Sequence, residues 1–176
     1  MKKKILIFGP GDFGQVAYFY LTKDSEYQVV GFTAHKNKIK DEKLFDLPVI
    51  PFEEIEQKYP PDEFSMFIAI PYTNLNQIRA KIFSEVKQKG YELISYINSK
   101  ATVWDDINVG ENCFILENNV IQPYVTIGND VIMWSGNHVG HHTVIKDHCF
   151  LASHVVISGK VTIEPYCFLG VNATIR

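Results

Sequence analysis

Five of the six histidines in this 176-residue chain fall within residues 138–154. They are His138, His141, His142, His148 and His154. A neutral imidazole can accept a proton near pH 7 without any shift of its pKa, so histidine is the usual general base at neutral pH. The grouping therefore suggests that at least one of these residues is catalytic. We expect His148 and His154 to be turn residues.

A glycine-rich segment, residues 9–14 (GPGDFG), follows an apolar run at residues 4–8. Such glycines let the backbone approach a phosphate, and the following helix offers free N–H donors at its N-terminus. Residues 32–36 (FTAHK), after the next apolar run, lack the acid that holds the ribose in dinucleotide-binding folds. The segment therefore favours a nucleotide-diphosphate ligand over NAD or FAD. The alternative is a turn that only lets the helix pack on the strand.

The second half of the chain repeats every six residues, beginning at residue 101. Apolar residues recur thirteen times in succession at this interval: Val103, Val109, Ile115, Ile121, Ile127, Met133, Val139, Ile145, Leu151, Ile157, Ile163, Leu169 and Ile175. A helix has a period of 3.6 and a strand a period of two, so neither explains a period of six. A parallel β-helix does, with three hexads forming each coil of about 18 residues. We predict a left-handed parallel β-helix in which all thirteen residues are buried.

The first half alternates strand-like and helix-like segments, which predicts a parallel α/β sheet of Rossmann type. The predicted strands are residues 4–8, 28–32, 47–50, 64–70 and 92–96. We expect a Rossmann-like nucleotide-binding domain at residues 1–98 and a β-helix domain at residues 101–176. The hexads continue to Arg176 without a capping segment, so we expect either that further coils complete the β-helix or that something else covers its end.

The composition argues against several classes of partner. A net charge of −3 and a pI near 6.1 provide no basic excess for nucleic acid or an anionic membrane. No apolar stretch is long enough to span a membrane, and the N-terminal apolar run is too short for a signal peptide. Cys113, Cys149 and Cys167 all occupy the small inward position of a hexad. Their odd number and placement indicate core thiols in a reducing cytoplasm.

Together these segments resemble the family of sialic acid O-acetyltransferases and bacillosamine-type sugar N-acetyltransferases. The resemblance rests on the 5–14 strand and loop, the 70–90 strand and helix with Arg79, the 97–101 linker and the GHHTVI hexad at residues 140–145. It covers the whole chain. It implies transfer of an acetyl group from acetyl-CoA to an amino group or hydroxyl of an activated or free sugar. It also implies a homotrimer with active sites between neighbouring β-helices.

The resemblance also assigns candidate site residues. His141 matches the catalytic base, and Gly159, one coil later, matches the glycine whose N–H holds the oxyanion. His142 stands where the family often has an acid that orients the base, which leaves that role to Asp147 or another polar group. Trp134 replaces an asparagine of the family's sugar pocket. The predicted substrate-binding residues are Gly9, Gly11, Asp12, Phe13, Gly14, Trp134 and His138.

Two other functions remain open from the sequence. The departures at His142 and Trp134 are compatible with a non-catalytic homologue that binds a sugar nucleotide or acts as a scaffold. A zinc enzyme resembling γ-carbonic anhydrase would need a further histidine well upstream. Because no histidine lies between residues 36 and 137, we predict no metal site. The identity of the sugar, of its nucleotide and of the acylated atom is also open.

Overall fold

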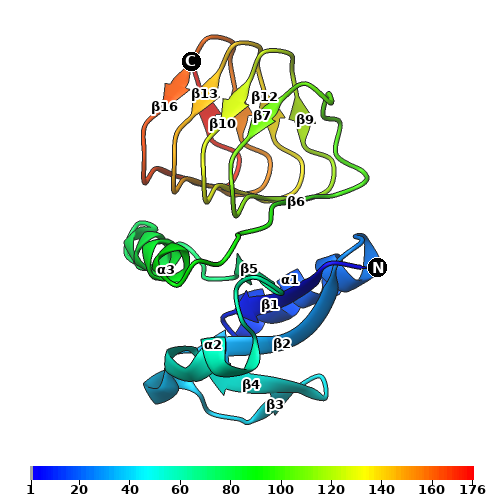
Figure 1. Ribbon diagram of the computed structural model, residues 1–176. Helices are drawn as coiled ribbons and strands as arrows, with labels where there is room; N and C mark the ends of the chain where they lie inside the picture. Colours follow the sequence, from blue (N-terminus) through cyan, green and yellow to red (C-terminus); the bar gives the residue numbers. More distant parts are fainter. Residues whose placement is uncertain (1) are drawn as a thin grey trace. The chain divides into compact units, whose positions relative to one another are not determined.

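The computed structural model describes residues 2–176 (Figure 1). The chain forms two compact units. The first comprises residues 2–71 and 81–94, and the second comprises residues 72–80 and 95–176. Helix α3 (Gln77–Gln88) therefore contributes its first turn to the second unit and the rest to the first.

The first unit is built on a five-stranded sheet in the order β3-β4-β2-β1-β5. Its strands are β1 (Lys4–Phe8), β2 (Gln28–Ala34), β3 (Lys43–Leu44), β4 (Leu47–Pro51) and β5 (Ser65–Ile68). The other elements are α1 (Asp12–Lys23), η1 (Lys36–Lys38), η2 (Phe52–Glu54) and α2 (Ile55–Lys58). All pairings are parallel except that of β3 with β4. The predicted parallel α/β unit is confirmed.

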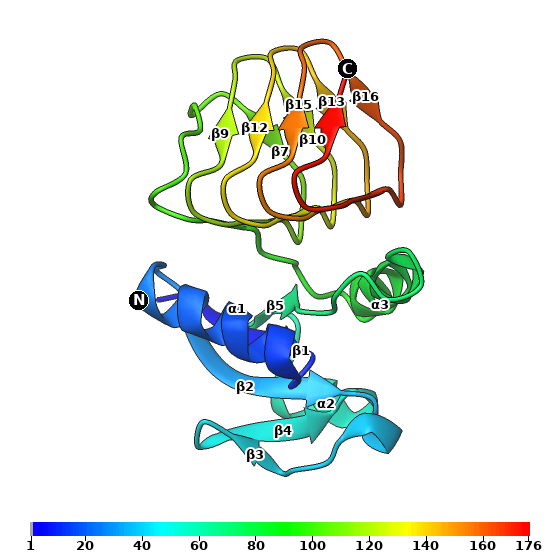
Figure 2. The same ribbon diagram turned by 180° about the vertical axis from the view of Figure 1, so that it is seen from behind.

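Helix α1 packs through one apolar face. Phe13, Ala17 and Leu21 recur at every fourth position and are buried, as is Gly14. Figure 2 shows α1 lying against β1 and β2. This packing sets the glycine-rich segment at the carboxyl end of β1.

The sequence prediction was wrong at two places in this unit. The short β3–β4 hairpin was not predicted; its turn residues Phe45 and Asp46 have φ of 51° and 62°. Residues 92–96 do not form a sheet strand, since only Leu93 makes an isolated bridge, to Met66. The backbone instead enters the β-helix early, where β6 (Tyr96–Ile97) pairs with β8. The first coil therefore starts before the first recognisable hexad.

The second unit is a parallel β-helix of three sheets, and its two-residue strands are aligned from coil to coil (Figure 1). The first sheet contains β7 (Asn108–Val109), β10 (Thr126–Ile127), β13 (Val144–Ile145) and β16 (Thr162–Ile163). The second contains β6, β8 (Phe114–Ile115), β11 (Ile132–Met133), β14 (Phe150–Leu151) and β17 (Phe168–Leu169). The third contains β9 (Val120–Ile121), β12 (His138–Val139), β15 (Val156–Ile157) and β18 (Thr174–Ile175).

Paired residues such as Thr126 and Val144 are separated by three hexads, so three hexads make one coil, as predicted. The left-handed sense stays a prediction.

The thirteen hexad residues form one apolar core. Nine of them, from Ile115 to Ile163, are at most 5% exposed. The other four are half-buried: Val103, Val109, Leu169 and Ile175. These four lie in the first and last coils, which have a neighbouring coil on one side only. The predicted burial therefore holds within the stack and is partial in its two outer coils.

Every sixth residue from Asn112 to Asn172 turns the chain with a positive φ. Asparagine, aspartate, histidine and glycine are suited to this left-handed conformation. Because three hexads make one coil, these corner residues stack along three edges. We name them the Asp130 edge (Asn112, Asp130, His148, Tyr166), the Gly136 edge (Asn118, Gly136, His154, Asn172) and the His142 edge (Tyr124, His142, Lys160).

Candidate functional site

The His142 edge joins β12 to β13 and carries the predicted base. Residues 140–143 form its turn, and the side chains of His141 and His142 are both exposed. His141 is anchored through its backbone. Its N–H donates to Gln122 Oε1 at 2.8 Å, and its carbonyl accepts from the Lys160 N–H at 2.8 Å. The coils before and after thus fix its position.

Two glycines allow the chain to pack closely around the His141 imidazole: Gly159 against the ring and Gly140 against the Gly159 backbone. A Cβ on Gly159 would lie 2.8 Å from both Cε1 and Nε2 of His141, so the ring lies directly against this glycine. A Cβ on Gly140 would lie 2.4 Å from the Gly159 nitrogen. Within residues 2–176 the Gly159 N–H has no hydrogen-bond acceptor. The imidazole and an available backbone donor are therefore side by side, as base-assisted acyl transfer requires.

His142, not Asp147, is the polar neighbour of the His141 ring. The two Nδ1 atoms are 3.0 Å apart, and the rings are perpendicular, with centroids 5.1 Å apart. Asp147 does not take the orienting role that the sequence left open to it. Its Oδ1 accepts a hydrogen bond from the Asn129 N–H at 2.7 Å, near the Asp130 edge. Asp147 follows Asn129 by 18 residues, which is one coil, so the coil period predicts this pairing.

Sequence reasoning missed Gln122 and Tyr124, which also belong to the site. Tyr124 is 70% exposed, and its ring centroid is 4.7 Å from that of His142. It occupies the corner one coil before His142, so the coil period would have indicated it. Gln122 lies next to the same corner and holds the His141 backbone.

The other histidines are spread around the β-helix. His138 is the first residue of β12, faces outward and is partly exposed, between Val120 and Val156 of the neighbouring coils. His148 and His154 are corner residues with φ of 60° on two other edges, which confirms that they are turn residues. The stretch of five histidines is therefore not a single cluster within one chain.

Trp134 lies beside the Gly136 edge, away from His141 in the same coil. Its side chain is partly buried, and its carbonyl accepts hydrogen bonds from the amides of Asn119 and Asn137. Asn137 Nδ2 also donates to Asn119 Oδ1 at 2.9 Å, which forms a buried asparagine ladder inside this edge. A single chain therefore does not bring Trp134 and His141 together.

The glycine-rich segment lies in the first unit, and two of its glycines have a packing role. A Cβ on Gly14 would lie 1.8 Å from the Gly9 carbonyl oxygen. Gly9 has φ of 110°, and a Cβ there would lie 2.6 Å from the Ala69 oxygen. Gly11, the N-cap of α1, has nothing within 4 Å. Asp12 is exposed and Phe13 faces the sheet. Gly11 is thus the glycine that leaves the helix N-terminus open to a ligand.

The end of β2 has carboxylates that the local sequence does not show. His35 Nδ1 is 3.2 Å from Glu53 Oε1, and its Nε2 is 3.0 Å from Glu85 Oε2. Glu53 follows β4, and Glu85 comes from the part of α3 that belongs to the first unit. Strand alternation alone could not predict this convergence, because the two glutamates come from separate elements further along the chain.

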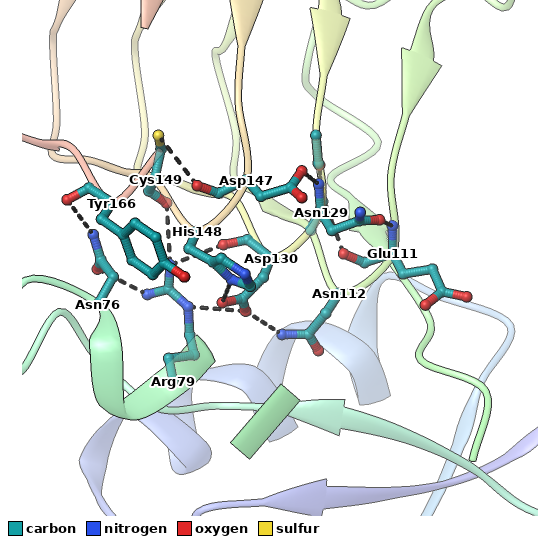
Figure 3. A network of polar contacts seen from close by, with 12 residues as sticks. Asn76, Arg79, Glu111, Asn112, Asn129, Asp130, Asp147, His148, Cys149 and Tyr166 are labelled. Carbon is teal, nitrogen blue, oxygen red and sulfur yellow. Dashed lines mark hydrogen bonds and ion pairs between the residues drawn. The ribbon is translucent and has the colours of Figure 1, made fainter. Parts of the chain in front are cut away.

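The Asp130 edge holds a buried ion network (Figure 3). Arg79 Nε donates to Asp130 Oδ1 at 2.9 Å, and both side chains are fully buried. Asn112 donates to the same oxygen at 2.7 Å, and His148 Nδ1 is 2.8 Å from Oδ2. Arg79 also donates to the Asp130 and Cys149 carbonyls and to Asn76 Oδ1. Every group here has a protein partner, so this edge is structural.

Comparisons with known proteins agree with both units. Residues 4–86 match the family model described as the PglD N-terminal domain. The acetyltransferase domain of PglB from Neisseria gonorrhoeae is 20% identical, with a TM-score of 0.84 over 99% of this chain and 82% of its own. WeeI from Acinetobacter baumannii is also 20% identical, with a TM-score of 0.80 over 98% of this chain and 80% of its own. PerB from Caulobacter crescentus, solved with CoA and GDP-perosamine, is 19% identical, with a TM-score of 0.74 over 98% of this chain and 88% of its own. These likenesses establish the fold.

Two features are absent from the part of the chain that the structure describes. No helix in residues 2–176 has the length and apolar character needed to cross a membrane. Within the same residues, no three His, Cys, Asp or Glu side chains are grouped so that they could hold a metal ion.

Proposed function

We propose that this protein is a sugar acetyltransferase that moves the acetyl group of acetyl-CoA to an amino group, or a hydroxyl, of a nucleotide-linked sugar. The observation that carries the proposal is the His141 imidazole packed against Gly159, whose N–H has no acceptor within residues 2–176. The comparisons support it, because the PglB acetyltransferase domain was also solved with acetyl-CoA, and PerB with CoA and an amino-sugar nucleotide.

In this proposal His141 acts through Nε2 as a general base. It removes a proton from the sugar amine or hydroxyl as that atom attacks the thioester carbonyl. The Gly159 N–H stabilises the resulting oxyanion. The intermediate then collapses, the C–S bond breaks, and the CoA sulfur leaves with the proton that His141 had taken. His142 contacts the His141 ring, and His138 lies on β12, the strand that leads to this edge.

The nucleotide part of the substrate is assigned to the first unit. The backbone N–H groups of Asp12 and Gly14 lie in the first turn of α1, where a helix has donors without intrahelical partners and a positive dipole end. Gly11 leaves that end uncovered. The exposed Asp12 carboxylate repels phosphate, so we expect the helix to bind a diphosphate with modest affinity. Trp134 is assigned to the sugar pocket.

We further propose a cytoplasmic homotrimer in which a neighbouring copy completes each site. The two sheets that meet at the His142 edge expose apolar residues on their outer faces. Val120, Val144 and Val156 are 39%, 36% and 43% exposed. Apolar faces beside the base give a second copy a surface to cover. In such an assembly Trp134, which lies on another edge, faces the His141 of a neighbouring copy.

The experiment is a screen of UDP-, dTDP- and GDP-linked amino sugars with acetyl-CoA. Thiol release measures turnover, and mass spectrometry identifies the acetylated sugar. We expect release with at least one sugar. Binding of a nucleotide sugar without thiol release from any acceptor would contradict the proposal and favour a non-catalytic binding protein. Light scattering that gave a monomer mass would remove the shared-site arrangement.

A further inference from the structure

The contact between His141 and His142 restricts where their hydrogens can be. Two neutral imidazole nitrogens 3.0 Å apart form one hydrogen bond, in which one Nδ1 carries the hydrogen and the other accepts it. If His141 carries it, His141 Nε2 keeps a free lone pair. If His142 carries it, the hydrogen of neutral His141 moves to Nε2, which then cannot accept a proton. The neighbouring ring therefore decides whether His141 can be a base.

We propose that His142 is a positioning residue for His141: its neutral Nδ1 accepts a hydrogen bond from the His141 Nδ1–H and so keeps His141 Nε2 unprotonated against Gly159. The catalytic consequence rests on the proposed function. The hydrogen bond itself does not, and it can be measured in the protein without any substrate.

His142 is well placed for this role because its backbone is fixed at the corner and its ring lies against that of Tyr124. Its φ of 60° belongs to the corner conformation, and its N–H is 3.3 Å from the Pro123 carbonyl. The Tyr124 ring lies against its imidazole. Lys160 is the charged residue on the next corner of the same edge. No carboxylate in residues 2–176 lies within hydrogen-bond distance of either imidazole.

A neutral partner differs chemically from a carboxylate in one respect. A carboxylate fixes the same tautomer but also forms an ion pair with the protonated base, which makes that base slower to return its proton. Imidazole orients the ring through a hydrogen bond between neutral groups. The pair His141–His142 is therefore an alternative solution to the orientation of a catalytic histidine, built from two adjacent residues of one turn.

The test is the tautomer of His141 in the protein labelled with ¹⁵N-histidine. Long-range ¹H–¹⁵N spectra distinguish a protonated ring nitrogen from an unprotonated one. We expect the Nδ1–H form for His141 in the unmodified protein. In His142→Gly, which keeps the positive φ without strain, we expect His141 to shift towards the Nε2–H form. The turnover number should fall, by at most the about 10⁴-fold that a wrong tautomer costs a catalytic histidine, with KM for acetyl-CoA unchanged.

Two further variants separate positioning from folding. His142→Asn tolerates the corner conformation, and its amide oxygen can accept the His141 hydrogen, so it should restore most of the tautomer and the turnover. His154→Gly makes the same backbone change on the Gly136 edge and should leave the His141 tautomer unchanged. An Nε2–H form of His141 in the unmodified protein, or a tautomer unaffected by His142→Gly, would overturn the inference. The expected tautomer without acetyl transfer to any sugar would support the hydrogen bond and overturn the proposed function.

Discussion

The Asp130 edge and the His142 edge share one backbone conformation and use it for opposite purposes. Asp130 and His142 have φ of 57° and 60°. Asp130 is fully buried and its carboxylate is paired with Arg79, Asn112 and His148. His142 is exposed, and its ring contacts are His141 and Tyr124. One edge satisfies all its polar groups inside the protein, and the other leaves an imidazole and a backbone donor facing outward.

The comparison shows that a histidine's neighbours one coil away decide its role. His148 lies one coil after Asp130 and stacks on Tyr166, with ring centroids 5.1 Å apart. His142 lies one coil after Tyr124 and has no acid partner in residues 2–176. Both residues occupy the same corner position in their hexads. The first completes an ion network, and the second stays exposed beside His141, which we propose as the base.

The largest effect is expected from Arg79→Met on the Asp130 edge. The variant leaves a buried carboxylate without its guanidinium, and breaking a buried ion pair on one side costs about 3–5 kcal/mol. Urea denaturation followed by circular dichroism measures the loss. The double variant Arg79→Met/Asp130→Asn should recover much of it, because no buried charge remains.

Lys146→Met provides the control for an ion pair on the surface. Lys146 contacts Glu164 at 2.7 Å, and both side chains are exposed. Such pairs contribute less than about 1 kcal/mol. A loss in Arg79→Met no greater than in Lys146→Met would show that the buried pair of Arg79 with Asp130 does not stabilise the β-helix.

On the His142 edge, Gly159→Ala should impair turnover more than folding. The added Cβ would lie 2.8 Å from the His141 ring and displace it, and a shift of about 1 Å at a catalytic group can cost about 100-fold in rate. Gly170→Ala is the matched control, because a Cβ there meets nothing within 4 Å. Turnover and thermal unfolding of both variants give the measurement. Equal turnover in the two would mean that the His141–Gly159 contact is unimportant.

The interior of the Asp130 edge should make stability depend on alkaline pH. Burial raises the pKa of the Cys113 and Cys149 thiols to about 12. In the unfolded chain the pKa of a thiol is about 8.5. The folded state therefore keeps protons that the unfolded state loses, and stability falls as pH rises from about 8.5 towards 12. The expected slope is about 1.4 kcal/mol per pH unit for each thiol.

Denaturation at pH 8 and pH 10 measures this slope. Burial also raises the pKa of Tyr91 to about 12, and that tyrosine contributes in the same direction. The variant Cys113→Ala/Cys149→Ala keeps Tyr91, so the difference between the two proteins isolates the thiols. An identical loss of stability in both would show that the thiols are not the cause.

The β-helix could be predicted from sequence because its side chains repeat with its backbone. The thirteen hexad residues fix both the inward face and the length of a coil, from which pairs such as His141 with Gly159 follow directly. The early start at Tyr96 could not be predicted, because its coil precedes the first hexad. The pairing of Asp147 with Asn129 could be predicted from the period, although the family resemblance left Asp147 open as a partner of the base.

The sequence pattern could not predict which distant segments contact each other. Arg79 belongs to a predicted helix, yet nothing in residues 70–90 shows that Asp130 is its partner. His35 is likewise joined to Glu53 and Glu85 by the packing of separate elements. The Nδ1 contact of His141 with His142 depends on side-chain rotation at a corner, which hexad spacing does not specify.

The most direct test of the central claim is the turnover of His141→Ala with a sugar acceptor identified in the screen. General-base catalysis contributes about 10²- to 10⁴-fold, so turnover should fall by that factor, with KM for acetyl-CoA nearly unchanged. His138→Ala, nearby on the same side of the coil, should retain far more activity. Near-normal turnover in His141→Ala would contradict the account and move the base to His138 or His142.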